Sequence, residues 1–170
     1  SLGLCSGEGS DQKFKAADGM ASFYSDAPME DIEAISKSVN SLIDLEKNEL
    51  AFLIPISSFE FDKKLMQEHI NENYMESEKY PSASFKGNLI GYDAETKGIQ
   101  SVEAKGEMTI HGMKRNISVN GTLESSGQKI ILKSKFPISV ADYDIEIPKV
   151  VFYNISETVD VTLELTYEPL

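Results

Sequence analysis

The sequence predicts an all-β, mainly antiparallel fold that closes into a barrel of about eight strands, with one α-helix covering it. The main observation is an alternation of apolar and polar residues that runs from Ser101 to the C-terminus and resets at turn-like clusters. Successive side chains of a strand face opposite sides, so this period of two indicates antiparallel strands with one buried face. The second observation is one helical stripe, Met66, Ile70 and Tyr74, within Asp62–Tyr74. A β-sandwich has the same alternation and stays open as the alternative.

The second half of the chain supplies four of the expected strands. A tight turn is expected at His111–Met113, and hairpin loops at Gly91–Gly98 and Ser125–Gly127. The inward-facing positions form four series: Val102, Ala104, Gly106, Met108 and Ile110; Ile117, Val119, Gly121 and Leu123; Ile130, Leu132, Ser134, Phe136 and Ile138; and Val159, Val161, Leu163, Leu165 and Tyr167.

The first half is less regular. Short strands are expected at Phe14 and at Met20–Ser25, and a helical turn over Pro28–Ile35, because acidic residues follow the proline. Further strands are expected where apolar runs flank turn residues. Their ranges are Ser38–Leu45 and Glu49–Ile56, joined by Glu46–Asn48, and Ser82–Ile90 after the helix.

Composition and charge narrow the functional classes. The 170 residues carry a net charge of −12 at pH 7, whereas nucleic acids and anionic membrane surfaces bind clusters of Lys and Arg. With 41% hydrophobic residues and no linker-like tract, the chain is expected to form one domain. No stretch approaches the roughly 20 apolar residues of a spanning helix. We therefore expect no nucleic-acid partner and no stable membrane insertion, and a homodimer stays open.

The first residues have the character of a processed export signal. An apolar, small-residue run starting at Ser1 leads into the polar segment Glu8–Asp11. We therefore expect residues 1–12 to be a signal remnant or flexible N-terminus, residues 13–170 to be the barrel domain, and the protein to be periplasmic or secreted. Cys5 is the only cysteine, so no intrachain disulfide is expected. A lipid anchor on Cys5 is less favoured, because Leu4 stands where bacterial lipoprotein signals have a small residue.

Several blocks of the sequence are similar to the motifs of one protein family. The block Leu65–Met75 is similar to that family's His-bearing helix, and Glu78–Phe85 to the Lys-Tyr-Pro step into a strand that ends in Phe. Gly106–Met113 is similar to the Gly-x-Leu-Thr-hydrophobic-His-Gly hairpin, and Ala141–Ile145 and Glu157–Val161 to the closing strands. Together these blocks resemble the YceI-like family, and the resemblance covers most of Phe14 to Glu168 in a consistent order.

The resemblance implies an extended lipocalin-like barrel, usually exported, whose lumen takes up a long amphiphile such as a polyisoprenoid or a quinone-like lipid. Departures from the pattern are Gln67-Glu68 before His69, where many members have Arg-Asp, and Met108 in the usual Leu position. These departures leave the identity of the ligand open. No cofactor is expected apart from a bound isoprenoid or other lipid.

Candidate ligand-binding residues lie on the apolar faces of the expected strands and on the helix. A narrow apolar passage gains about 0.8 kcal/mol for each buried methylene-sized group, so shape and dryness do most of the selecting. The same residues would also fill a closed core, which stays open as an alternative. If they line a cavity, we expect it to be elongated and on the order of several hundred Å³. The candidates are Phe52, Ile54, Met66, His69, Ile70, Tyr74, Phe85, Leu89, Met108, Ile110, Ile117, Val119, Leu132 and Phe136.

The histidines and acidic residues do not form a recognisable catalytic or metal motif. His69 and His111 are expected near a barrel mouth, within reach of a polar head group. His69 and Glu72 are only an i, i+3 pair, short of the His-Glu-x-x-His spacing of zinc sites. Nucleophile-elbow, P-loop and dinucleotide motifs are also missing from the sequence. We therefore rank a non-catalytic lipid-binding barrel first, a closed structural or stress-related interaction domain second, and a metal-dependent hydrolase third.

Overall fold

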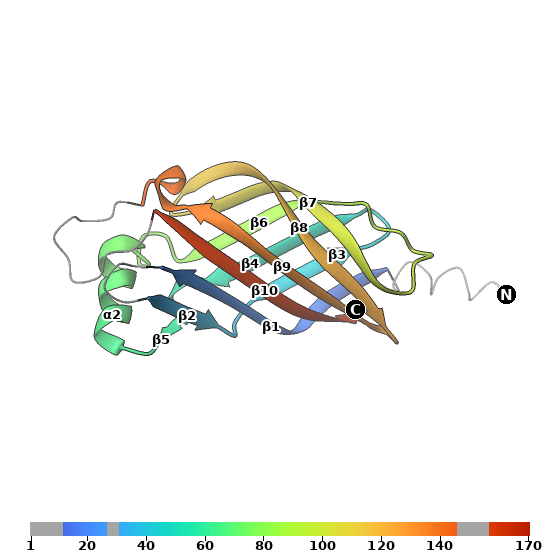
Figure 1. The fold of residues 1–170 in the computed structure, drawn as a ribbon, viewed down its shortest axis with the longest axis horizontal. Helices are drawn as coiled ribbons and strands as arrows, with labels where there is room; N and C mark the ends of the chain where they lie inside the picture. Colours follow the sequence, from blue (N-terminus) through green and yellow to red (C-terminus); the bar gives the residue numbers. More distant parts are fainter. Residues whose placement is uncertain (1–11, 27–30, 146–156) are drawn as a thin grey trace.

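Eight antiparallel strands close into a barrel (Figure 1). The structure, a computed structural model, describes residues 12–26, 31–145 and 157–170. Around the ring the order is β1-β10-β9-β8-β7-β6-β4-β3, and β3 pairs back with β1. The predicted closed barrel is therefore confirmed over the β-sandwich. The ring strands are β1 (Lys13–Ser25), β3 (Asn40–Asp44), β4 (Glu49–Pro55), β6 (Ser82–Ile90), β7 (Gly98–Ile110), β8 (Met113–Ser126), β9 (Lys129–Ser139) and β10 (Thr158–Pro169).

The barrel forks along β1. The first residues of β1, Lys13–Lys15, pair with β3, whereas its last residues, Ala21–Ser25, pair with β2 (Ile32–Ser36). β2 in turn pairs with the short strand β5 (Glu60–Phe61), which follows the 3₁₀ turn η1 (Ile56–Ser58). The two short strands β2 and β5 therefore lie outside the ring, at one end of it.

Two expectations for this region need correction. The two short strands expected at Phe14 and Met20–Ser25 are one continuous strand with a bulge between Ala16 and Asp18. The helical turn expected over Pro28–Ile35 is wrong from Ile32 onward, because those residues form a strand with alternate residues buried. The first part of that turn, residues 28–30, lies outside the described residues.

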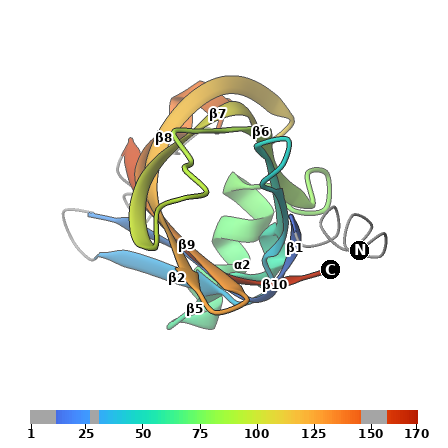
Figure 2. The same cartoon turned by 90° about the vertical axis from the view of Figure 1, so that its right-hand side faces the viewer.

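The predicted helix is confirmed with a change of hydrogen-bonding pattern along its length. It begins as the α-helix α2 (Lys64–His69) and continues as the π-helical turn η2 (Ile70–Tyr74), where the Met75 N–H bonds the Ile70 carbonyl at 2.8 Å. The predicted stripe of Met66, Ile70 and Tyr74 is buried. Figure 2, which looks along the barrel, shows α2 across its far end. Among the described residues, no helix has both the length and the apolar character needed to cross a bilayer.

The barrel end away from the helix is filled by its own side chains. Tyr167 on β10 is fully buried there, and its hydroxyl lies 2.6 Å from the hydroxyl of Ser41 on β3. A well-packed interior of this kind leaves no passage for a ligand. The lumen is therefore blind at this end. Other buried residues that fill it are Phe14, Ile43, Leu45, Leu123 and Ile130.

A pair of glycines lets two neighbouring strands approach closely. Gly87 on β6 faces Gly106 on β7 in the strand register. A Cβ on Gly87 would lie 2.2 Å from the Lys105 carbonyl oxygen, and a Cβ on Gly106 would lie 2.3 Å from the Lys86 carbonyl oxygen. Only a residue without a side chain fits at either position.

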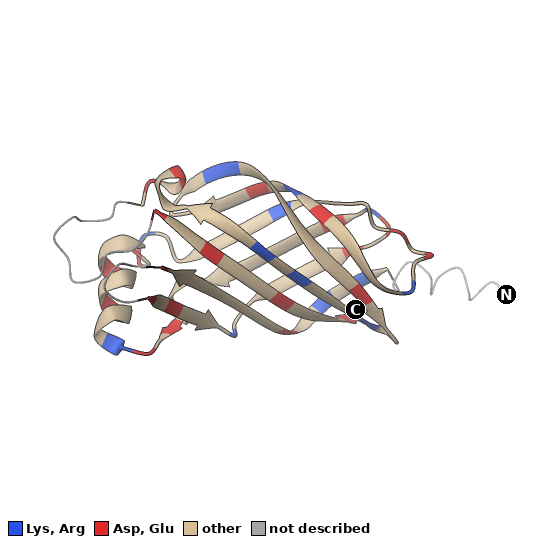
Figure 3. Ribbon diagram, viewed as in Figure 1, with Lys and Arg blue, Asp and Glu red and all other residues tan. Residues whose placement is uncertain are grey.

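The outer surface mixes both signs of charge. Figure 3 shows acidic and basic positions interspersed along the visible face of the barrel. On that face Lys133 of β9 stands directly opposite Glu164 of β10. Cross-strand pairs of opposite charge add a little stability and keep the surface free of a large field of one sign.

The helix α2 is followed by a short segment that leads into β6, and β9 is followed by the 3₁₀ turn η3 (Val140–Tyr143). Arg115 on β8 donates a hydrogen bond from Nε to the Asp142 carbonyl of η3 at 2.9 Å. These connections lie at the helix end of the barrel (Figure 1). They frame the end of the barrel at which the helix lies (Figure 1).

Candidate functional site

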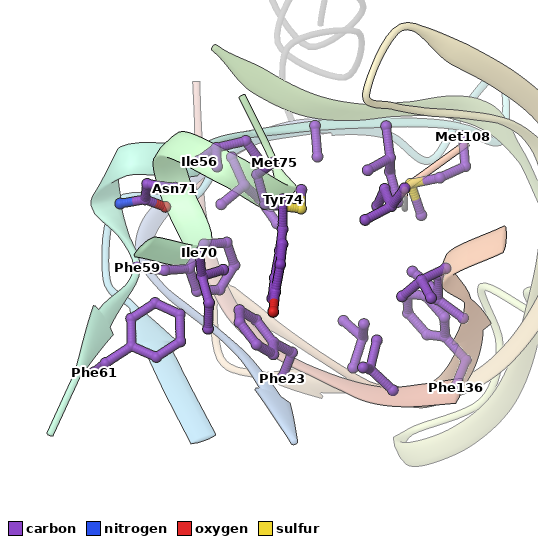
Figure 4. A pocket seen from close by; sticks show the side chains of 18 of the residues that line it. Phe23, Ile56, Phe59, Phe61, Ile70, Asn71, Tyr74, Met75, Met108 and Phe136 are labelled. Atoms are coloured by element: carbon purple, nitrogen blue, oxygen red, sulfur yellow. The ribbon is translucent and has the colours of Figure 1, made fainter. Parts of the chain in front are cut away.

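An apolar cavity, here called the outer chamber, lies inside the barrel under the helix (Figure 4). The cavity has a volume of about 120 Å³, and no polar atom contributes to its surface. An apolar cavity of this size stays dry and can take up a small apolar group. Its lining residues are Phe23, Phe52, Ile54, Ile56, Phe59, Phe61, Ile70, Asn71, Tyr74, Met75, Ala83, Met108, Ile110, Phe136, Ile138, Val140, Ile145, Val159 and Val161.

Three aromatic rings close the outer chamber on the side where the barrel forks. Phe23 of β1 contacts Phe59 and Phe61 edge to face, with ring centroids 5.2 and 5.5 Å apart. Edge-to-face packing is a favoured geometry for aromatic pairs. These rings therefore form a continuous apolar surface between β1 and β5, where the ring of strands is no longer closed by β3.

The helical segment covers the outer chamber on one side. Figure 4 shows Tyr74 projecting from the helical segment into the chamber, with its hydroxyl directed toward Phe23. Tyr74 is buried, and this burial raises the pKa of its phenol. The Asn71 amide points away from the chamber in the same view. The helical segment therefore presents apolar surface to the chamber, because the Tyr74 hydroxyl contributes no polar atom to the chamber surface.

A second, smaller cavity, the inner chamber, lies deeper in the lumen. Its volume is about 30 Å³, and its surface is also apolar. Three side chains, Phe52, Met108 and Phe136, line both chambers. We call these three side chains the waist. The other residues of the inner chamber are Leu50, Phe85, Leu89, Val102, Ala104, Val119, Asn120, Gly121, Leu132, Ser134, Leu163 and Leu165.

The two chambers are smaller than the several hundred Å³ expected from the sequence. The difference has a physical cause. The waist occupies the middle of the lumen, and Tyr167 with its neighbours fills the far end. Apolar interiors pack to nearly crystalline density wherever side chains can meet, so alternation alone overestimates the open space.

Most of the predicted site residues line one chamber or both. Ile54, Ile70, Tyr74 and Ile110 line the outer chamber, and the waist residues Phe52, Met108 and Phe136 line both. Phe85, Leu89, Val119 and Leu132 line the inner chamber. Met66, His69 and Ile117 line neither. Met66 is the buried residue of α2, and Ile117 packs against the hydrophobic core, so both positions contribute to packing.

The aromatic group Phe23, Phe59 and Phe61 is not among the residues predicted from the sequence. One signal was present, since Phe59 and Phe61 are two positions apart and could have been assigned to the same face of a short strand. Some of the remaining missed residues lie on strands already predicted, but a period of two does not show how close to the mouth of the barrel each residue lies. The others lie in the helical segment or in the short turns near the helix, where no alternation applies. Together the remaining missed residues are Ile56, Asn71, Met75, Ala83, Ile138, Val140, Ile145, Val159 and Val161.

The two histidines have separate partners in the structure. His111 Nε2 lies 2.6 Å from Glu76 Oε2, and its Nδ1 lies 3.2 Å from the Tyr143 carbonyl oxygen. His69 Nδ1 lies 2.9 Å from the Asn73 amide nitrogen. Contact between either histidine and a lipid head group stays a prediction. Within residues 12–26, 31–145 and 157–170, no three His, Cys, Asp or Glu side chains gather closely enough to hold a metal ion.

The family model of the YceI-like domain matches residues 11–167. The chain belongs to the YceI-like domain family. The predicted resemblance is thereby confirmed, and it extends over nearly the whole barrel. A search of curated protein sequences found no match.

Solved structures share the fold of this YceI-like chain at low sequence identity. A polyisoprenoid binding domain from Saccharophagus degradans has a TM-score of 0.80 at 16% identity and covers 92% of this chain and 98% of its own. BcnA from Burkholderia cenocepacia has a TM-score of 0.73 at 17% identity, covering 87% and 95%. A YceI protein from Campylobacter jejuni has a TM-score of 0.59 at 16% identity, covering 72% of each chain. At these identities the likeness establishes the shared fold.

Proposed function

We propose that this YceI-like barrel binds the apolar tail of a long amphiphile, a polyisoprenoid or a quinone-like lipid, in its lumen and does no chemistry on it. The observation that carries the proposal is the outer chamber, a cavity of about 120 Å³ without a polar atom on its surface. Closed cores rarely keep apolar space larger than a water molecule, because each void forfeits packing energy. An apolar tail recovers that energy when it enters.

The lining of the outer chamber favours binding over catalysis. Acid-base catalysis needs a titratable group within hydrogen-bond reach of the reacting atoms. Among the described residues that line the outer chamber, Tyr74 alone has a side chain that can lose a proton, and burial raises the pKa of its phenol, which keeps the phenol neutral. A neutral phenol is a weak base, and this one contributes no polar atom to the chamber surface. The arrangement therefore suits retention of a tail.

The comparisons support the choice of ligand class. The Saccharophagus degradans neighbour is described as a polyisoprenoid binding domain, and its fold matches this chain over nearly its whole length. A tail with methyl branches has the bulk to contact ring-lined surfaces such as Phe23, Phe59 and Phe61. We therefore propose a prenyl tail ahead of a straight acyl chain.

Two neighbouring residues of β4 test the proposal. Ile54 is buried and lines the outer chamber, whereas Leu53 points outward and is 41% exposed. We expect Ile54→Asn to weaken binding of a fluorescent geranylgeraniol analogue about tenfold or more, since an amide without a partner in an apolar site costs about 1–3 kcal/mol. Leu53→Asn, the matched control, should bind like the unmodified protein.

Circular dichroism and the melting temperature establish that both variants are folded, and Ile54→Thr offers a smaller change if Ile54→Asn unfolds. The alternative function, a closed structural domain, makes the opposite prediction. If the unmodified protein retains no analogue, or if Leu53→Asn and Ile54→Asn weaken retention equally, the lumen is not the binding site and the proposal is wrong.

A further inference from the structure

We propose that the waist, formed by Phe52, Met108 and Phe136, is an internal gate that sets how long a tail the barrel accepts. The inference rests on the proposed function and deepens it. The three side chains are the only residues, among those described, that line both the outer and the inner chamber. A tail that reaches from the outer chamber into the inner chamber must therefore pass these three side chains.

The strand order places the waist across the full width of the barrel. Phe52 lies on β4 and Phe136 on β9, and these two strands are four steps apart in the ring of eight. They are therefore on opposite sides of the lumen. Met108 lies on β7, between them in the ring. The three side chains close the passage from three sides.

Two parts of the waist differ in how easily they can move. Phe52 stacks on Phe85, with ring centroids 5.4 Å apart and an angle of 18° between the rings. The register places these two residues directly opposite each other on β4 and β6, and Phe85 opposite Met108 on β7. Displacing Phe52 would break the stack. Met108 is unbranched and can change rotamer without leaving the row, so it is the moving part of the gate.

The sizes of the chambers say where along a tail the gate acts. The outer chamber, at about 120 Å³, is slightly smaller than a cavity of about 150 Å³ that takes up benzene. It therefore holds a group about as large as one isoprene unit while the gate is closed. Movement of Met108 joins it to the inner chamber, and Tyr167 with its neighbours ends the passage beyond that. The barrel should favour tails up to a set length.

A matched pair of alanines separates the two chambers experimentally. Ala83 on β6 lines only the outer chamber, and Ala104 on β7 lines only the inner chamber. Both are buried, at 9% and 7% exposure. Ala83→Leu and Ala104→Leu therefore add the same three carbons on either side of the waist. Ala104→Val is the smaller step if Ala104→Leu lowers the folded fraction.

The probes are prenol, geraniol, farnesol and geranylgeraniol, which differ only in the number of isoprene units. For the unmodified protein we expect affinity to rise with tail length and then to level off. Ala104→Leu should remove the rise for the longer tails, by about tenfold or more, because a few lost methylene contacts account for that factor. Ala83→Leu should weaken the binding of all four prenols, and the affinity should still rise with tail length.

A third variant addresses the gate itself. Met108→Ala should join the two chambers and speed the association of geranylgeraniol relative to that of geraniol, in stopped-flow measurements. If Ala104→Leu and Ala83→Leu give the same pattern across the four prenols, the waist does not divide the site and the inference is wrong, although the proposed function stands. If the unmodified protein binds none of the prenols, the proposed function itself fails.

Discussion

His111 Nε2 and Glu76 Oε2 lie 2.6 Å apart, which joins the turn between β7 and β8 to the segment that follows the helix. The imidazole is nearly buried, stacks edge to face on Tyr80 at 4.5 Å, and contacts the Tyr143 carbonyl through Nδ1. Both His111 and Glu76 adopt positive φ angles, at 54° and 47°. Non-glycine residues hold this conformation only where their surroundings fix it. The pair therefore holds the rim of the barrel together.

The rim pair should contribute to stability. Residues next to it in sequence, Ile110 and Met75, line the outer chamber, so the pair also fixes two parts of that chamber relative to each other. We expect Glu76→Ala to lower the free energy of unfolding by about 1 kcal/mol, because a nearly buried imidazole loses one of its two hydrogen-bond partners. Urea unfolding measures the change. Glu78→Ala, an exposed position two residues away, is the control, and an equal loss there would show that the His111 contact contributes nothing.

A pH dependence follows from Tyr167 in the packed end of the barrel. Burial raises the pKa of its phenol above the ordinary value of 10.0, so the folded protein keeps it neutral where the unfolded chain ionises. The stability that it contributes is therefore present below about pH 10 and is lost as the pH rises above that value. We expect the free energy of unfolding to fall more steeply between about pH 9 and 11 in the unmodified protein than in Tyr167→Phe.

The same variant removes the bond between Tyr167 and Ser41, so at about pH 8 it should be less stable than the unmodified protein by about 1 kcal/mol. Urea unfolding at a series of pH values measures both effects. Parallel curves for the two proteins across the alkaline range would contradict the assignment of the alkaline loss to this phenol.

The close approach of β6 and β7 gives a third prediction. A Cβ on Gly106 would lie 2.3 Å from the Lys86 carbonyl oxygen and 2.4 Å from the Gly87 Cα, and both are backbone atoms that cannot turn aside. We expect Gly106→Ala to destabilise the protein by about 2 kcal/mol or more, since forced contacts in a packed region shift the backbone. Thermal unfolding measures it. Lys105→Ala on the exposed face should change little, and a tolerated Gly106→Ala would show that these strands separate easily.

Much of the barrel can be predicted from the sequence, because apolar and polar residues alternate wherever one face of a strand is buried. This holds for Val102 to Ile110 and for Val159 to Tyr167. It fails at Ile32–Ser36, where a short strand follows a proline and acidic residues that also suit the start of a helix. The local sequence there favours the start of a helix, whereas pairing with the last residues of β1 favours a strand. The strand forms because of that pairing, which the local sequence does not show.

The candidate site is predicted in part for a related reason. Alternation shows which residues of a strand face inward, so it correctly predicts Ile54 and Ile110. It does not show how far along the barrel axis a residue lies, so Ile117 is included although it lines neither chamber. The waist was predicted residue by residue without its role. Its role depends on β4 and β9 being opposite in the ring, which no single segment encodes.

The central claim, that the lumen takes up an apolar tail, is tested most directly by methyl NMR of the protein labelled at methionine. Met75 and Met108 line the outer chamber, whereas Met113 is 39% exposed at the turn between β7 and β8 and serves as the internal control. On addition of geranylgeraniol we expect the methyl signals of Met75 and Met108 to shift and to show contacts with the protons of the tail, while the Met113 signal stays in place. Contacts to Met113 alone, or none to the three methyl groups at saturating prenol, would contradict the claim.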